Sequence, residues 1–253
     1  MAPSPESPLD CPTPSAACYK GGPRPAAPAV APRAHPPLFG PPPGRPYNPA
    51  PPPAGAPSGA AVADLPFKAS DAIGVLMAYS AKVRIDQIGS NDTTDTLTNG
   101  VSSRRNQLLM DISSELGVAS VDGAAEATLD KLAQIVNKAA PNYKPFGAVL
   151  SEALRDRLRS LFGAAGVKQQ YIRDRVANVW QLGEGWVASV LATLLLDTRE
   201  GASSRGGDLA KLPTAAVQNK PEADKLIDAA VEVVAQLKGV AVALPSAGGA
   251  AGG

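Results

Sequence analysis

An all-α fold is predicted for residues 64–238 of this 253-residue chain. Within that range, apolar side chains recur at steps of three and four residues, which is the spacing of one buried helical face. Residues that stop helices, among them Gly117 and Pro141, separate these segments. Twenty of the 26 prolines fall instead in residues 1–57. We therefore expect residues 1–63 to be a disordered Pro/Ala-rich linker.

Three helices are predicted in residues 64–140. The first begins at Ser70-Asp71, the second begins near Ser102, and the third spans Ala124–Ala139. A long irregular passage, Arg84–Thr98, separates the first two. The apolar residues expected in the core are Ile73, Leu76 and Met77; then Ile85, Ile88 and Leu97 of the irregular passage; then Leu108, Leu109, Ile112 and Leu116; and finally Leu129, Leu132, Ile135, Val136 and Ala139.

Four more helical segments are predicted in residues 141–238, and together they indicate a second core. They are Ala148–Phe162, Gln169–Leu182, Trp186–Leu196 and Glu222–Leu237, the last of which Pro221 opens. Trp186–Leu196 is almost entirely apolar, so we expect it at the centre of that core. It is too short to cross a bilayer, and we expect no membrane partner. Residues 239–253 are a Gly/Ala-rich tail.

The charge distribution excludes one class of partner. The net charge of the whole chain is +1; the linker holds four basic and two acidic residues, which leaves 20 basic and 21 acidic residues elsewhere. No basic stripe with interleaved aromatic residues is present, so we expect no nucleic-acid binding.

Side chains suited to catalysis are scarce. Cys11, Cys18 and His35, the only residues of their types, all lie in the linker. The folded part therefore has no His-based nucleophilic pair and no His-ligated metal, and the two thiols fit a cytoplasmic chain. Gly183-Glu184-Gly185 lacks the third glycine of a dinucleotide-binding loop and lies between two helical patterns, so we interpret it as a turn. We predict no metal and no catalytic residue.

One stretch, Asn99 to Gly117, has the pattern of a site. It reads NGVSSRRNQLLMDISSELG, which places Ser102 and Ser103 at the start of an amphipathic helix. Free backbone N–H groups and the positive end of the helix dipole favour an anion there, in particular a phosphate on the hydroxyl. The alternative is that the serines only cap the helix, which is worth about 1 kcal/mol of stability.

This stretch resembles the modification site of acyl carrier protein domains, specifically those of the type I fatty acid synthases of fungi and mycobacteria. In that family a Gly-Gly-x-Ser site is followed by Asn, a short apolar run, Asp and a closing Glu-(Phe/Leu)-Gly. Here the site itself reads Asn99-Gly100-Val101-Ser102. The matching residues after it are Asn106, Leu108, Leu109, Asp111 and Glu115-Leu116-Gly117.

The resemblance extends beyond the serine site. Ser70-Asp71 and Asp86-Gln87-Ile88 match before it; Trp180-Gln181-Leu182-Gly183-Glu184-Gly185 and Glu222-Ala223-Asp224 match after it. It implies an acyl-carrier-like four-helix bundle (64–140) followed by a helical structural subdomain (141–238), with linkers at both ends. The Arg104-Arg105 pair departs from many free-standing carrier proteins, which are acidic at those positions.

The resemblance also implies a function. Ser102, rather than Ser103, would carry covalent 4′-phosphopantetheine taken from coenzyme A by a phosphopantetheinyl transferase. The thiol of that group would hold the growing acyl chain of fatty acid biosynthesis. The other partners would be the ketosynthase, ketoreductase, dehydratase, enoyl reductase and acyltransferase domains of a multifunctional synthase. The domain itself would have no catalytic activity.

Two questions stay open at this point. A helical adaptor module on a Pro-rich tether, with Ser102 as a cap only, is the alternative to the carrier. Val101, Arg104, Arg105 and Leu108 are candidates for a docking face, while the two arginines fit a solvated helix flank equally well.

Overall fold

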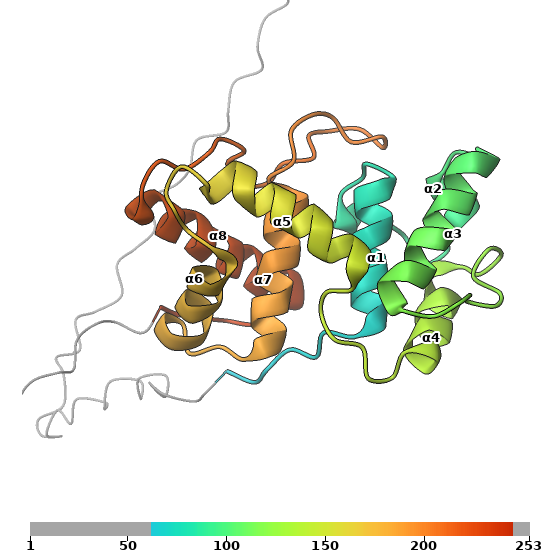
Figure 1. Cartoon of the computed structure of the whole chain (residues 1–253), viewed down its shortest axis with the longest axis horizontal. Helices are drawn as coiled ribbons and strands as arrows, with labels where there is room; N and C mark the ends of the chain where they lie inside the picture. Colours follow the sequence, from blue (N-terminus) through green and yellow to red (C-terminus); the bar gives the residue numbers. More distant parts are fainter. Residues whose placement is uncertain (1–61, 245–253) are drawn as a thin grey trace, which may run out of the picture. The chain divides into compact units, whose positions relative to one another are not determined.

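The computed structural model of the chain describes residues 62–244. Predictions for the linker up to residue 61, including those for Cys11, Cys18 and His35, and for the tail beyond residue 244 lie outside this range. The described residues form helices joined by loops, with no strand beyond two isolated bridges, so the all-α prediction is confirmed (Figure 1). No helix in this range is both long and apolar enough to span a membrane.

The helices follow the predicted order closely. They are α1 (Ala69–Ser80), a 3₁₀ turn η1 (Ile85–Gln87), α2 (Thr94–Leu97), α3 (Ser102–Leu116), α4 (Leu129–Ala139), α5 (Ala148–Phe162), α6 (Gln169–Asp174), a π-helical segment η2 (Arg175–Val179), α7 (Glu184–Asp197) and α8 (Lys220–Lys238).

The first group of helices is organised around α1. Helix α1 packs against both α3 and α4, while α2 lies against α3. Most of the predicted core residues point inward: Ile73, Leu76, Met77, Leu97, Leu108, Ile112, Leu132 and Val136 are buried. Burial of these side chains is the main stabilising term for the group, at about 1.5–3 kcal/mol for each large side chain. Partial burial is found for Ile85, Ile88, Leu109, Leu116, Leu129 and Ile135. The prediction is wrong for Ala139, which is exposed at the last residue of α4.

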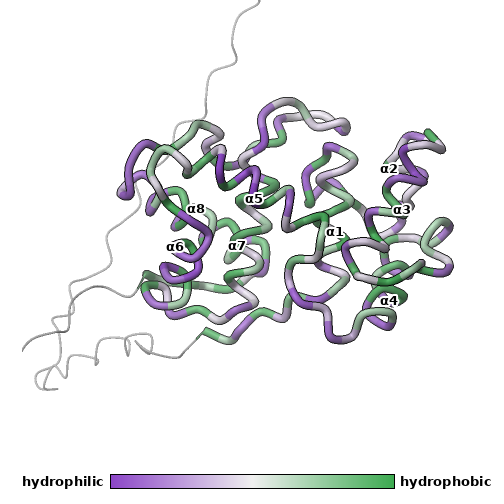
Figure 2. Tube along the Cα trace, viewed as in Figure 1, coloured by the Kyte–Doolittle hydropathy of each residue, from purple (hydrophilic) through white to green (hydrophobic). Residues whose placement is uncertain are grey.

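The second group is organised around α7, as its composition predicts. Every residue of α7 from Gly185 to Asp197 is buried except Ser189. Helices α5, α8 and η2 pack against it, and α7 also packs against α1. In Figure 2 hydrophilic residues gather along α6 and the first half of α3, on the periphery of the apolar packing. The buried residues of both groups form one continuous apolar core, so the predicted second core is not separate from the first.

Three predicted segments differ from the structure by more than two residues. The third helix begins at Leu129 instead of Ala124, because Thr128 forms a bridge with Thr93 and the Leu129 N–H donates to the Asp92 carbonyl at 2.7 Å. The passage Arg84–Thr98 is not wholly irregular, since it contains η1 and α2. The predicted helix Gln169–Leu182 is α6 followed by η2, and it ends at Val179.

Glu115 joins the end of α3 to the start of α5. It is 2% exposed, and its carboxylate accepts hydrogen bonds from the Tyr143 hydroxyl (2.5 Å), the Gly147 N–H (2.6 Å) and the Leu150 N–H (2.8 Å). Both N–H groups belong to the first turn of α5, where free donors and the helix dipole favour a carboxylate. A Cβ at Gly147 would overlap the Glu115 backbone carbonyl, so glycine permits this approach. Burial, with the adjacent Glu115 carboxylate, raises the pKa of Tyr143 above its ordinary value.

The segment that leads into α1 crosses the start of α7. The Gly185 N–H donates to the Asp64 carboxylate at 3.0 Å. A Cβ at Gly183 would overlap that carboxylate, and a Cβ at Gly185 would overlap the carbonyl of Leu65. The two glycines allow one backbone to pass close over another. Gly183 and Gly185 thus serve the packing of two chain segments. The interpretation of Gly183-Glu184-Gly185 as a turn is wrong in part, because Gly183 is the N-cap of α7 while Glu184 and Gly185 are its first two residues.

Candidate functional site

The chain reverses sharply just before α3. Asn99 and Gly100 both have left-handed backbones, with φ of 54° and 70°. These are the residue types that adopt this conformation at little cost. The Gly100 N–H donates to the Asp95 carbonyl (3.0 Å), and the Val101 N–H donates to the Thr98 carbonyl (3.1 Å). The turn thus connects the last residues of α2 directly to the start of α3.

Ser102 is the first residue of α3 and is exposed. The residue at the N-cap is Val101, whose side chain has no atom that could accept a hydrogen bond. Within the described range, the N–H groups of Ser102, Ser103 and Arg104 have no backbone acceptor, and neither serine hydroxyl is hydrogen-bonded. The interpretation of the serines as caps is therefore not supported by the geometry, because neither one caps the helix.

The start of α3 suits a phosphate ester on a serine hydroxyl. Three N–H groups point out of a 15-residue helix, whose dipole places partial positive charge at this end. The Ser102 side chain is exposed, and a Cβ at the nearby Gly100 would meet nothing within 4 Å. Ser103 is equally exposed in the same first turn, so the geometry alone does not choose between the two serines.

Nearby carboxylates do not oppose an anion at this place. The Arg105 guanidinium donates to the Asp95 carboxylate at 3.0 Å. The negative charge of Asp95, the acidic residue of α2, is therefore paired with a residue of α3. Asp111, two turns further along α3, accepts from the Gln107 amide at 2.8 Å. Arg104 is exposed, and no ion pair engages it within residues 62–244. The local balance at the helix start is therefore positive.

The four candidates for the docking face differ in how exposed their side chains are. Leu108 is wrong as a docking residue, because it is 1% exposed and belongs to the core. Arg105 is partly used by its ion pair with Asp95, whereas Val101 and Arg104 are exposed. The sequence reasoning missed Met110, which is 64% exposed. Helical spacing contained the signal, since residue 110 lies two positions, about 200°, from the buried position 108.

No other constellation in the described part of the chain competes with this one. Among residues 62–244, no group of three or more His, Cys, Asp or Glu side chains could hold a metal ion. The site to be explained is therefore an exposed serine at a helix start within an all-α fold.

This all-α fold is consistent with that of a carrier domain. Residues 63–242 match the family described as the acyl carrier domain of fatty acid synthase subunit alpha, and the chain belongs to this family. The predicted acyl carrier function is confirmed, and the adaptor alternative is not favoured.

Three curated relatives agree with this assignment. The chain is 29% identical over 204 residues to fatty acid synthase subunit alpha of Candida parapsilosis, which covers 81% of this chain and 10% of the relative. The Schizosaccharomyces pombe protein of the same name is 28% identical over 190 residues, which cover 75% of this chain and 9% of the relative. The protein of the same name from Lachancea kluyveri is 28% identical over 191 residues, which cover 74% of this chain and 9% of the relative. The chain spans about a tenth of the length of these relatives.

Proposed function

We propose that Ser102 carries 4′-phosphopantetheine through a phosphodiester on its Oγ. The observation that carries the proposal is the position of Ser102, exposed at the first residue of α3 with free N–H groups around it. Acyl carrier domains work through this prosthetic group, and the resemblance of Asn99–Gly117 to their modification site selects Ser102 over Ser103.

The attachment is a phosphoryl transfer in which this chain supplies the nucleophile. Ser102 Oγ attacks the phosphorus that bears the pantetheine half of coenzyme A. The new Oγ–P bond replaces the P–O bond to the leaving adenosine 3′,5′-bisphosphate, and a base of the phosphopantetheinyl transferase takes the hydroxyl proton. The free N–H groups of Ser102, Ser103 and Arg104 at the start of α3 would favour the negative charge of a phosphodiester on Ser102. When bound, the group supplies a terminal thiol that holds an acyl chain as a thioester.

The remaining role of the chain is delivery. We infer a type I synthase of the fungal or mycobacterial kind as its setting, in the cytoplasm. The partners would be its ketosynthase, ketoreductase, dehydratase, enoyl reductase and acyltransferase sites. Residues 64–140 would present the acyl group, residues 141–238 would support them, and the segments on either side would act as tethers. Tethers raise the effective concentration of the carrier at each site to about the millimolar range, so each docking contact can be weak.

The intact mass of the protein tests the assignment. The purified chain is incubated with coenzyme A and a broad-specificity phosphopantetheinyl transferase. We expect a gain of roughly 340 Da, the mass of one phosphopantetheine group added to a serine. The gain should disappear in Ser102→Ala and persist in the matched control Ser103→Ala.

Two other results would contradict the proposal. A gain that survives Ser102→Ala but is lost in Ser103→Ala would move the attachment to the neighbouring serine. No gain under conditions that modify a known carrier protein would leave Ser102 without this role and would favour the adaptor alternative for this chain.

A further inference from the structure

A loop that follows α7 reaches across to the first group of helices. This segment, residues 201–212, will be called the clasp loop, and it is the orange loop that leaves α7 in Figure 1. It is closed on itself by a bridge between Ala202 and Asp208 and by the Ser203 N–H, which donates to the Gly207 carbonyl at 2.7 Å. The clasp loop is thus a structured projection.

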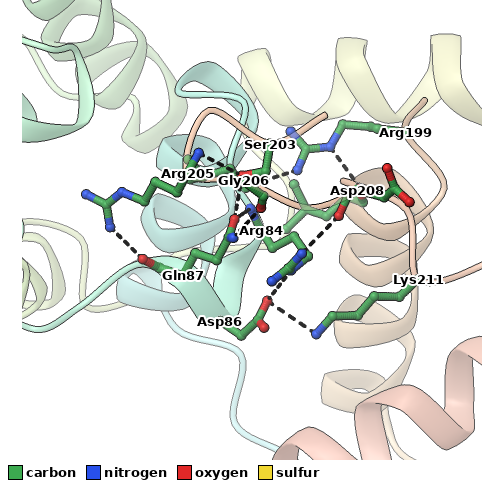
Figure 3. Close-up of polar contacts among 11 residues, drawn as sticks. Arg84, Asp86, Gln87, Arg199, Ser203, Arg205, Gly206, Asp208 and Lys211 are labelled. Atoms are coloured by element: carbon green, nitrogen blue, oxygen red, sulfur yellow. Dashed lines mark hydrogen bonds and ion pairs between the residues drawn. The ribbon is translucent and has the colours of Figure 1, made fainter. Parts of the chain in front are cut away.

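Backbone and amide groups join the clasp loop to the segment after α1. The Ser204 N–H donates to the Lys82 carbonyl and its hydroxyl donates to the Ala81 carbonyl, both at 2.9 Å. The Gln87 amide donates to the Gly206 carbonyl at 2.9 Å, as Figure 3 shows. These contacts join residues well over a hundred positions apart in the chain.

Arg205 makes the strongest of these contacts. Its guanidinium donates two hydrogen bonds to the Asp92 carboxylate, at 2.7 and 2.6 Å, and a third to the Gln87 carbonyl. The hydrogen bond from Arg205 is the main reason why the pKa of Asp92 is lowered to about 2. The side chains of Arg205 and Asp92 are 32% and 15% exposed, so solvent screens this ion pair only partly.

Asp92 also accepts hydrogen bonds from both α2 and α4. Its carboxylate accepts from the Gly89 N–H (2.7 Å) and the Thr96 hydroxyl (3.2 Å), and Thr96 lies in α2. Its backbone carbonyl accepts from the N–H of Leu129, the first residue of α4. The position of Asp92 therefore affects both helices.

From α2 the connection continues to the start of α3. Helix α2 has a single turn, which is too short to be stable by itself and depends on tertiary contacts. Its residue Asp95 accepts the Gly100 N–H through its carbonyl and the Arg105 guanidinium through its carboxylate. Gly100 and Arg105 lie on either side of Ser102. A displacement of α2 therefore displaces the turn that presents Ser102.

We propose that Arg205 is a positioning residue for Ser102, acting through Asp92 and α2. This inference rests on the proposed role of Ser102 as the phosphopantetheine site. Arg205 touches neither Ser102 nor anything bound to it. It keeps α2 and the Asn99-Gly100 turn in the one arrangement that the transferase binds. The second group of helices thereby takes part in presenting the serine.

The expected effect is on binding of the carrier and not on the chemical step. Without Arg205, α2 and the start of α3 populate the competent arrangement for only a fraction of the time. The apparent affinity of the transferase falls by that fraction. We expect KM for the carrier to rise about threefold to tenfold in Arg205→Ala, with kcat unchanged. Arg205→Lys keeps the positive charge but cannot make the bidentate hydrogen bond to the Asp92 carboxylate, so we expect an intermediate KM.

The experiment uses the full chain and two readouts. The first is the steady-state rate of phosphopantetheine transfer from coenzyme A for wild type, Arg205→Ala, Arg205→Lys, Asp92→Asn and the double variant. Arg155→Ala, which removes an exposed arginine of α5, is the matched charge control. The second readout is the set of backbone amide NMR signals of residues 93–105, which needs no transferase. Thermal unfolding by circular dichroism sets a temperature at which every variant is folded.

The proposal is supported if KM rises in Arg205→Ala, the double variant is no worse than the worse single variant, and amide signals of residues 93–105 shift. It is overturned if KM and those signals match wild type, or if Arg155→Ala raises KM as much as Arg205→Ala. If wild type is not modified at all while the signals still shift, the role of Ser102 fails and the coupling of Arg205 to α2 stands.

Discussion

Glu115 is one of two buried acidic residues among residues 62–244, and we predict that removal of its carboxylate destabilises the protein strongly. Replacing Glu115 with alanine removes the carboxylate that accepts from three donors: the Tyr143 hydroxyl and the N–H groups of Gly147 and Leu150. Of these, the Gly147 N–H also donates to the Tyr143 hydroxyl oxygen at 3.2 Å. All three lie at the joint between α3 and α5, and Glu115 itself is 2% exposed. Water cannot easily replace the carboxylate without opening this joint.

The magnitude follows from those three contacts. A buried polar group left without a partner costs about 1–3 kcal/mol. Some of the donors will gain partial access to water, so we expect Glu115→Ala to lower the free energy of unfolding by about 3–5 kcal/mol. Glu115→Gln keeps one acceptor oxygen but turns an amide N–H toward a donor, and we expect a loss of about 1–3 kcal/mol.

Urea unfolding near neutral pH, followed by circular dichroism, measures these losses. Glu126→Ala is the matched control, because Glu126 is exposed in the turn before α4 and should change stability by no more than about 0.5 kcal/mol. A loss below about 1 kcal/mol in Glu115→Ala, with an unchanged dependence on urea, would refute the view that this carboxylate holds α5 to α3.

Three further changes test other parts of the packing. Burial raises the pKa of Asp197 to about 6 from 3.8, so the stability that this group contributes is present below pH 3.8 and is lost as the pH rises through about 6. Urea unfolding at a series of pH values should show a loss of up to about 2–3 kcal/mol across that window, and Asp197→Asn should remove it; an unchanged slope would contradict the assignment. Gly185→Ala places a Cβ on the Leu65 carbonyl and should cost about 3 kcal/mol or more in thermal or urea unfolding. Gly74→Ala, inside α1 with its nearest neighbour at 3.9 Å, should instead stabilise the protein by about 0.5–1 kcal/mol. A loss of stability in Gly74→Ala would contradict the view that the added methyl group fits beside Ile85.

Short-range pattern was sufficient for most helices and for the candidate serine. The bounds of α5 were predicted to the residue, because Leu150, Leu154, Leu158 and Leu161 repeat at helical spacing and all are buried. The same reasoning placed Ser102 at a helix start, because Asn-Gly followed by serines and an amphipathic run is a local signal. Each of these features depends on residues within one or two helical turns of each other.

Contacts between residues far apart in the sequence decided the features that short-range pattern did not predict. The sequence by itself determined the helical periods and the turn at Asn99-Gly100, and its resemblance to the carrier modification site is the basis for proposing Ser102 over Ser103. Only the tertiary structure decided that α4 begins at Leu129, that Glu115 caps a helix of the second group, and that Arg205 holds Asp92. A hydrogen bond between residues 32 to 113 positions apart leaves no period in the sequence, since its geometry exists only after both segments have packed on a common core.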